Sequence, residues 1–254
     1  SIGNEVLEYG ADVLLAPALN IHRNPLCGRN FEYYSEDPLL SGMMAANMVT
    51  GLQSRGIYVF AKHFALNDQE TNRNGVCIWS NEQAMREIYF VPFEKAVKEG
   101  GSTAVMSSYN NIGTTWAGAS TALLTNVLRN EWGFIGTVIT DNNEEHGFMD
   151  IEKAVLAGGT SLLFGWGTKT FDNLSQTATG QLKMREAAHQ YLYTLANSYG
   201  VDVDAPVPMW RTPALVGSVI VYVLVLAGVV VILRRRKYNK TLANTNAGAD
   251  VSKA

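Results

Sequence analysis

Short apolar runs, often β-branched, alternate along the first 200 residues with longer segments in which apolar positions recur at helical spacing. Runs of about four to eight such residues are typical of buried strands, and amphipathic segments of about ten or more are typical of helices. The pattern predicts the end of a helix at 1–9, strands at 12–19, 58–64, 103–109, 136–140 and 160–164, and helices at 38–54, 80–98, 121–130, 150–157 and 181–198.

This alternation predicts an α/β fold with parallel strands and right-handed crossovers. Polar residues gather at the end of nearly every predicted strand, and no glycine-rich phosphate loop follows any of them. These features favour a (β/α)8 TIM-type barrel over a doubly wound open sheet. Five strand–helix units make only a partial barrel, so we expect about three more units before Ser1. We also expect that residues 1–199 do not fold alone, because an open barrel leaves a sheet edge unpaired.

The pattern changes after residue 200. Residues 201–213 are expected to form a proline-containing linker, and 214–233 run for twenty residues without a charge. A helix of that length spans the ~30 Å hydrocarbon core of a membrane. A buried core helix is the alternative, but a soluble helix is seldom apolar all round and then followed by four basic residues. We therefore predict a transmembrane helix at 214–233.

The charge distribution predicts an orientation in the membrane. The tail, 234–254, carries six Lys/Arg and one Asp, so the remaining residues sum to −8 within a net charge of −3. Excess positive charge places a flanking segment in the cytoplasm. We expect a single-pass protein of the cell membrane with its first 200 residues outside the cytoplasm. The acidic body argues against nucleic acid as a partner.

The cysteines and histidines are few. Cys27 and Cys77 are too few for a disulfide framework, and either a single bridge or two buried thiols is compatible with the sequence. The four histidines have no metal-ligand spacing. The sequence therefore predicts neither a metal nor a cofactor.

The run 136–140 ends at Asp141, which is the first candidate for chemistry. A polar residue at the carboxyl end of a barrel strand lies where such barrels hold their active sites. The alternative is that Asp141 caps the helix that starts near Asp150.

Three further polar segments also lie at strand ends. They are Asn24–Pro38, Lys62–Arg73 and the run Met106-Ser107-Ser108-Tyr109-Asn110, with Thr140-Asp141 as the fourth motif in the series. With these motifs in this order, the chain resembles glycoside hydrolase family 3, the β-glucosidase-like retaining enzymes, from about residue 2 to 163.

The resemblance implies a role for each matching residue. Asp141 matches the catalytic nucleophile. The matches to sugar-binding positions are Arg29, Lys62, His63, Arg73 and Tyr109, with Met106 as an apolar contact. Cations beside a carboxylate lower its pKa, and a nucleophile must be ionised to act. We therefore expect Lys62 and Arg73 to keep Asp141 ionised.

Taken singly, these residues have simpler explanations. Arg29 could pair with Glu32 or Glu36 at the surface, His63 could be a satisfied core histidine, and Lys62 could extend to solvent. The ordered series of four motifs makes these the weaker account. Another charged cluster, Glu144-Glu145-His146, matches no family motif and is expected to be solvated or to line an outer pocket.

The chain departs from the family in two places. Asn142 follows the nucleophile where the family usually has Trp, and a family carboxylate that grips the same sugar would lie before Ser1. The acid/base of β-glucosidase-like members is a Glu on a separate sandwich domain, which is not visible here. Ala65-Leu66-Asn67 after Phe64 disfavours the N-acetylglucosaminidase branch, whose acid/base is a His in that loop. Some family members carry the sandwich domain before the barrel, and the order sandwich, barrel, anchor would reconcile the expected missing N-terminal part with the C-terminal helix.

The resemblance implies a membrane-anchored retaining β-glycosidase that acts on a β-linked oligosaccharide or glycoside by double displacement. The rival hypothesis is a membrane-anchored carbohydrate-binding protein with a decayed site. Asn142 and the missing acid/base favour the rival, and the series Arg29, Lys62, His63, Tyr109 and Asp141 opposes it.

Overall fold

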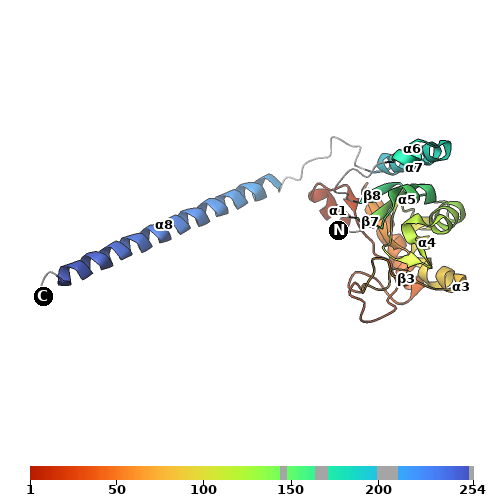
Figure 1. The fold of residues 1–254 in the computed structure, drawn as a ribbon. Coiled ribbons are helices and arrows are strands. Elements are labelled where there is room, and N and C mark those ends of the chain that lie inside the picture. Colours follow the sequence, from red (N-terminus) through yellow and green to blue (C-terminus); the bar gives the residue numbers. More distant parts are fainter. Residues whose placement is uncertain (144–147, 164–170, 199–210, 252–254) are drawn as a thin grey trace. The chain divides into compact units, whose positions relative to one another are not determined.

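The computed structural model describes residues 1–143, 148–163, 171–198 and 211–251 (Figure 1). The chain divides into two compact units, Ser1–Ala205 and Pro206–Ala254. Each unit is described by itself.

The first unit is built on a parallel sheet. Its strands are β1 (Val13–Leu14), β2 (Tyr58–Phe64), β4 (Ala104–Ser107), β7 (Thr137–Asn142) and β8 (Ser161–Leu163). They lie side by side in that order, and every neighbouring pair is parallel. A doubly wound sheet reverses its strand order at a switch point, whereas this order follows the chain without reversal. The sheet therefore confirms the predicted part-barrel.

Helical segments connect the strands. They are α1 (Ile2–Glu8), α2 (Pro38–Gln53), α3 (Glu82–Ala84), the π-helix η1 (Met85–Tyr89), α4 (Val91–Lys98), the 3-10 turn η2 (Ala117–Ala119), the π-helix η3 (Ala122–Glu131), α5 (Ile151–Ala157), α6 (Asp172–Ser175) and α7 (Ala178–Ala196). All the predicted helices are present. Asp37 caps α2 as expected, because its side chain accepts hydrogen bonds from the Leu39 and Leu40 amides.

Two parts of the sheet structure differ from expectation. The strand predicted at 12–19 is reduced to β1, since Pro17 has no amide hydrogen to donate to a ladder. The chain still follows β2 beyond that point, where the Lys62 amide donates to Pro17 O at 2.9 Å. A small second sheet was not predicted, and its strands β3 (Cys77–Ile78), β5 (Asn111–Ile112) and β6 (Thr115–Trp116) are too short to leave a pattern.

Most apolar side chains of the main sheet enter two clusters. On the helix-covered face, Val59, Val105 and Val138 pack with residues of α2 and α4 in the main core. Alternate residues, among them Phe60 and Met106, form a smaller cluster on the opposite face. Successive strand residues point to opposite faces, so both faces of the sheet are covered by apolar contacts and polar groups collect at the strand ends.

The end of α7 joins the beginnings of two strands. The Thr194 hydroxyl accepts a hydrogen bond from the Thr137 amide at 2.9 Å and donates one to Thr103 O at 2.7 Å. Leu195 packs against the smaller apolar cluster. The last helix of the unit therefore completes the hydrogen bonding of β4 and β7.

The second unit contains α8 (Arg211–Val251). Within it, Pro213–Arg235 is long and apolar enough to cross a membrane, and its side chains are not buried. The predicted span, 214–233, lies inside this segment. Most of the predicted linker, 201–213, lies outside the described residues, and the helix continues through the predicted tail to Val251.

The cysteines match neither expectation. Cys27 and Cys77 are both free, and Cys77 is exposed while Cys27 is partly buried. They are therefore neither bridged nor a pair of buried thiols.

Candidate active site

Asp141 lies in β7, one residue before the strand ends, and is 8% exposed. Its Oδ1 accepts a hydrogen bond from the Asn142 amide at 2.8 Å. Its Oδ2 is buried and has no hydrogen-bond partner within the part of the chain that the structure describes. The helix that follows is capped by Asp150 instead, whose side chain accepts from the amides of Glu152 and Lys153. Asp141 is therefore not a helix cap.

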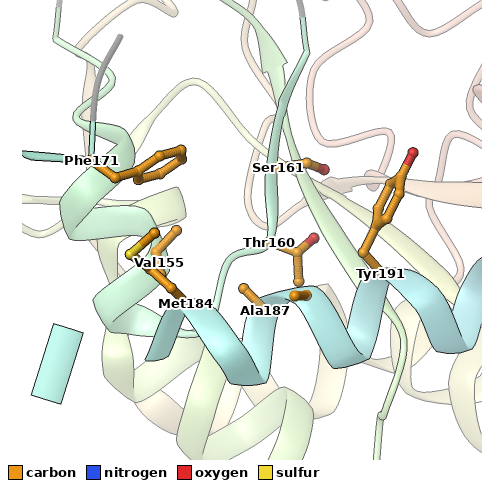
Figure 2. Close-up of a pocket in the computed structure, with 8 residues that line it drawn as sticks. Val155, Thr160, Ser161, Phe171, Met184, Ala187 and Tyr191 are labelled. Carbon is orange, nitrogen blue, oxygen red and sulfur yellow. The ribbon is translucent and has the colours of Figure 1, made fainter. Parts of the chain in front are cut away.

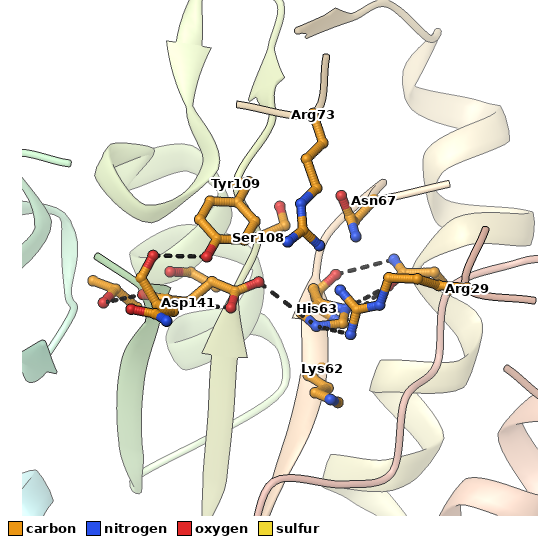
Figure 3. Close-up of polar contacts among 12 residues, drawn as sticks. Arg29, Lys62, His63, Asn67, Arg73, Ser108, Tyr109 and Asp141 are labelled. Atoms are coloured by element: carbon orange, nitrogen blue, oxygen red, sulfur yellow. Dashed lines mark hydrogen bonds and ion pairs between the residues drawn. The ribbon is translucent and has the colours of Figure 1, made fainter. Parts of the chain in front are cut away.

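His63, near the end of β2, is 1% exposed and lies between Asp141 and Arg29 (Figure 3). Its Nε2 is 3.6 Å from Asp141 Oδ2 and 2.9 Å from Arg29 Nη2. Burial and the neighbouring cations Arg29, Lys62 and Arg73 hold the pKa of His63 well below its ordinary value. The ring is therefore neutral near pH 7, and its contact with Asp141 is not an ion pair.

The next residue, Phe64, anchors the end of β2 in the main core. Its ring lies 5.1 Å from that of Phe93 and 5.5 Å from that of Trp132, measured between centroids. Phe64 directly follows His63 in the chain, so this aromatic packing helps to fix the backbone that carries His63.

Three cations surround this centre, and two carboxylates hold them. Lys62 Nζ lies 3.2 Å from Glu32 Oε2, and Arg29 donates to the other oxygen of the same carboxylate. Arg73 Nη1 lies 2.8 Å from Glu70 Oε2, and Arg29 Nη1 lies 3.9 Å from Glu70 Oε1. The pairing of Arg29 with Glu32 is thus real, but it belongs to a partly buried network that also reaches His63.

Tyr109 follows β4 and faces the same centre. Its hydroxyl donates to Asn142 O at 2.7 Å, and the Arg73 guanidinium lies over its ring, 4.5 Å from the centroid. Burial and the charge of Asp141 raise the pKa of Tyr109 to about 12. The hydroxyl therefore keeps its proton near neutral pH and can serve as a hydrogen-bond donor.

Met106, the predicted apolar contact, is 2% exposed and packs in the smaller apolar cluster with Phe60 and Ala104. Its contact with a sugar stays a prediction. The segment Glu144-Glu145-His146 lies outside the described residues, so its predicted place is not tested.

The cations act on the pKa of Asp141 in the predicted direction, but the net shift is upward because burial outweighs them. Burial raises the pKa of Asp141, and the opposing charges of Arg29, Arg73 and Lys62 do not fully offset it. The three cations are themselves paired with Glu32 and Glu70, which weakens their combined field. The sequence shows which charges are near, whereas burial depends on the tertiary structure.

Three residues of this site were not predicted as functional. Asn20, Glu32 and Glu70 each contact a predicted sugar-binding residue. Their only signal in the sequence is a polar side chain close to a strand end. No group of three or more His, Cys, Asp or Glu side chains suited to a metal occurs among the described residues.

A separate pocket of about 290 Å³ lies between α5, β8 and α7, lined by apolar side chains that include Val155, Met184 and Ala187 (Figure 2). None of its lining residues belongs to the charged centre. It is therefore a hollow in helix packing apart from the site at Asp141.

Comparison with known proteins identifies relatives of this chain. Residues 1–184 match the glycosyl hydrolase family 3 N terminal domain. The chain is 50% identical over 156 residues to β-glucosidase A of Butyrivibrio fibrisolvens, which is 61% of this chain and 18% of that protein. It is 45% identical over 146 residues to an exo-α-(1→6)-L-arabinopyranosidase of Bifidobacterium longum, which is 58% of this chain and 19% of that protein.

A solved structure agrees with these relatives. β-Glucosidase 3B of Thermotoga neapolitana in complex with α-D-glucose superposes with a TM-score of 0.73 at 42% identity, over 78% of this chain and 29% of that chain. The chain spans less than a fifth of the length of the two curated relatives above. The family match covers well over half of the chain, and the parallel sheet agrees with it. The chain therefore belongs to glycosyl hydrolase family 3 and carries N-terminal domain sequence of that family.

Proposed function

We propose that this chain is part of a membrane-anchored retaining β-glycosidase, with a β-linked oligosaccharide or glycoside as substrate and Asp141 as nucleophile. The observation that carries the proposal is the buried Oδ2 of Asp141, which has no hydrogen-bond partner among the described residues. A buried carboxylate oxygen is costly to leave unsatisfied, and such groups cluster at functional sites. The β-glucosidase relatives support the choice of substrate.

The proposed reaction has two displacements. Asp141 Oδ2 attacks the anomeric carbon, the bond from that carbon to the leaving oxygen breaks, and a general acid protonates that oxygen. A water molecule, deprotonated by the same group, then attacks the anomeric carbon and releases the Asp141 carboxylate. The covalent glycosyl–enzyme between the two steps is the testable intermediate.

The acid/base is proposed to lie on another part of the protein. Although burial raises the pKa of Glu32, the hydrogen bond from Arg29 and the charge of Lys62 lower it overall. Glu70 is held by Arg73 and Arg29. Both carboxylates are engaged with cations, so neither suits the delivery of a proton to a leaving group.

The surrounding polar groups are proposed to bind the sugar. Arg29, Lys62 and Arg73 offer N–H donors to hydroxyl groups, and the Tyr109 hydroxyl offers another. His63 would position Arg29 and contact the same sugar, and Met106 would supply apolar surface.

The first test is covalent labelling of the full chain with an activated 2-fluoro-glycoside that carries a good leaving group, which lessens the need for the acid. We expect a mass increment on the peptide that contains Asp141. Asp141→Asn should abolish the label, and Asp150→Asn is the matched control because asparagine also caps helices. A label on another peptide would contradict the assignment.

The rival is a carbohydrate-binding protein that no longer catalyses the reaction. Asn142, where the family usually has Trp, favours it. Isothermal titration of a longer protein that includes the flanking domains, with a β-linked disaccharide, separates the two hypotheses. Binding without turnover and without a covalent label would support the rival.

Membrane anchorage is proposed from Pro213–Arg235 and the basic residues after it, with the tail in the cytoplasm. Expression in cells followed by alkaline carbonate extraction tests the anchor. The chain should stay with the membrane pellet, and replacing Val223 and Val225 by Asp should release it. Protease added outside sealed cells should remove the first unit and spare the tail, whereas the opposite pattern would reverse the orientation.

A further inference from the structure

Asn20 is a buried side chain that holds His63 at three atoms. It is 2% exposed and lies just after the short bridge between Ala18 and Lys62. Its Nδ2 donates to the backbone oxygen of His63 at 3.0 Å, and its Oδ1 accepts from the His63 amide at 3.0 Å. The same Oδ1 lies 3.3 Å from Nδ1 of the imidazole ring.

The two backbone contacts fix which way the Asn20 amide points. A backbone N–H can only donate and a backbone oxygen can only accept. The side-chain oxygen of Asn20 must therefore face the His63 amide, and its NH₂ group must face the His63 carbonyl. Turning the amide over would oppose donor to donor and acceptor to acceptor in a buried site.

This orientation determines which ring nitrogen of His63 carries the proton. Asn20 Oδ1 is an acceptor, so Nδ1 must be the donor across the 3.3 Å contact. On the other side of the ring, Arg29 Nη2 lies 2.9 Å from Nε2 and can only donate. Nε2 must then carry a lone pair, so both sides of the ring require the same neutral tautomer.

We propose that Asn20 is a positioning residue that fixes His63 as the Nδ1-protonated neutral tautomer, and thereby withholds a proton donor from Oδ2 of Asp141. The second half of this proposal deepens the proposed function, because it concerns the readiness of the nucleophile. With Nε2 as an acceptor 3.6 Å away, His63 cannot donate to Asp141.

The physical consequence is a more reactive carboxylate. A hydrogen bond donated to a carboxylate stabilises its charged form and lowers its pKa, and an imidazolium would do so more strongly. Removing the acceptor at Nδ1 would let the ring move its proton to Nε2, where it faces Asp141. Asn20 thus acts on Asp141 only through His63.

The experiment uses the full chain in detergent micelles, labelled with ¹⁵N at histidine and ¹³C at the aspartate carboxyl groups. Two-bond proton–nitrogen spectra report which ring nitrogen is protonated, and His63→Gln assigns the signals. In the unmodified chain we expect Nδ1 protonated and Nε2 bare near pH 7. The reverse tautomer, or a doubly protonated ring, would overturn the proposal without any variant.

Two substitutions separate positioning from mere stability. Asn20→Ala should populate the Nε2–H tautomer and lower the pKa of Asp141 by roughly one. Asn20→Asp keeps an acceptor at Nδ1 and should restore the Nδ1–H tautomer. Asn110→Ala is the control, because it also removes a buried amide, one that donates to Ala65 O at 3.1 Å, and should leave both readouts unchanged.

The outcomes distinguish this inference from the proposed function. An unchanged ring spectrum and an unchanged Asp141 titration in Asn20→Ala would overturn the inference even if the covalent label forms. If the unmodified chain forms no label at Asp141, the proposed function fails, while the ring spectrum and the carboxyl titration still decide the role of Asn20.

Discussion

Aspartates near the strand ends of this protein differ from aspartates at its helix starts in how well their carboxylates are hydrogen-bonded. Asp37 and Asp150 begin α2 and α5, and each accepts two backbone N–H groups. Asp68, in the loop after β2, and Asp141, in β7, are buried; both carboxylate oxygens of Asp68 and the Oδ2 of Asp141 have no hydrogen-bond partner among the described residues.

The difference shows where the fold gains stability and where it gives some up. A capping carboxylate satisfies amides that would otherwise be orphaned, so it stabilises the folded state. A buried carboxylate with too few partners destabilises the folded state once it is ionised, which is why burial raises the pKa of both Asp68 and Asp141 despite the cations near them. Buried carboxylates near the strand ends therefore lower the stability of the folded state, and the capping carboxylates at the helix starts partly offset that loss.

The largest expected effect is on reaction rather than on stability. Asp141→Asn should slow formation of the covalent adduct by roughly four orders of magnitude or more, as loss of a nucleophile does elsewhere. The same variant should be more stable than the unmodified chain near pH 7, because it removes a buried charge. Single-turnover mass spectrometry measures the first effect and urea unfolding the second. If the Asp141→Asn chain unfolds more easily, the Asp141 carboxylate stabilises the fold as the capping aspartates do, and the contrast between the two groups is wrong.

The next effect concerns Asp68, which is 3% exposed and has its pKa raised to about 6 from 3.8. A raised pKa means that stability is fully present below the unfolded value and is lost as the pH rises through about 6. Asp68→Asn should therefore raise the free energy of unfolding at pH 7 to 8 by up to about 3 kcal/mol, with no gain below pH 4. Unfolding curves across pH test this, with Asp150→Asn as a control that shows no such gain. A loss of stability at pH 7 would show that the attraction of Arg23, which lowers this pKa, outweighs the effect of burial.

The helix starts should respond in the other direction. Asp37→Ala and Asp150→Ala should each lower the free energy of unfolding by about 1 kcal/mol, because two amides lose their acceptor. Replacement by Asn at the same positions should restore most of it. Chemical denaturation of the four variants gives the comparison, and equal losses for Ala and Asn would show that charge rather than capping matters.

The smallest expected effect concerns the ion pair of Asp150 and tests whether this residue stabilises the fold by capping alone. Lys153 Nζ lies 3.4 Å from Asp150 Oδ2 in an exposed i,i+3 pair. Lys153→Ala should change the free energy of unfolding by no more than about 0.5 kcal/mol. A larger change, measured by the same denaturation method, would assign the stabilising role of Asp150 to its ion pair instead of its amide contacts.

The sequence predicted the framework well, because hydrophobic spacing reports local structure. The bounds of β2 were predicted without error, and α2 was predicted to within one residue at its end. The chain order of the strands followed from strand–helix alternation, and the motif series located the charged centre.

What was missed depends on contacts between distant residues or on backbone detail. The π-helices η1 and η3 leave no distinct hydrophobic spacing, and β3, β5 and β6 have two residues each. Asn20 meets His63 from 43 positions away, so its role could not be read from its neighbours. The raised pKa of Asp141 needed its burial, which charge counting does not supply.

The hydroxyl of Thr194 also bears on the order in which the protein is made. A ribosome releases the chain from its N-terminus, so β4 and β7 emerge before the helix that supplies Thr194. Until then the Thr137 amide and the Thr103 carbonyl lack this partner, although they can still bond each other at 3.0 Å. The two strands can thus pair early in synthesis. The hydrogen bonds from Thr194 form only after the end of α7 has been made, shortly before the residues that lead to α8.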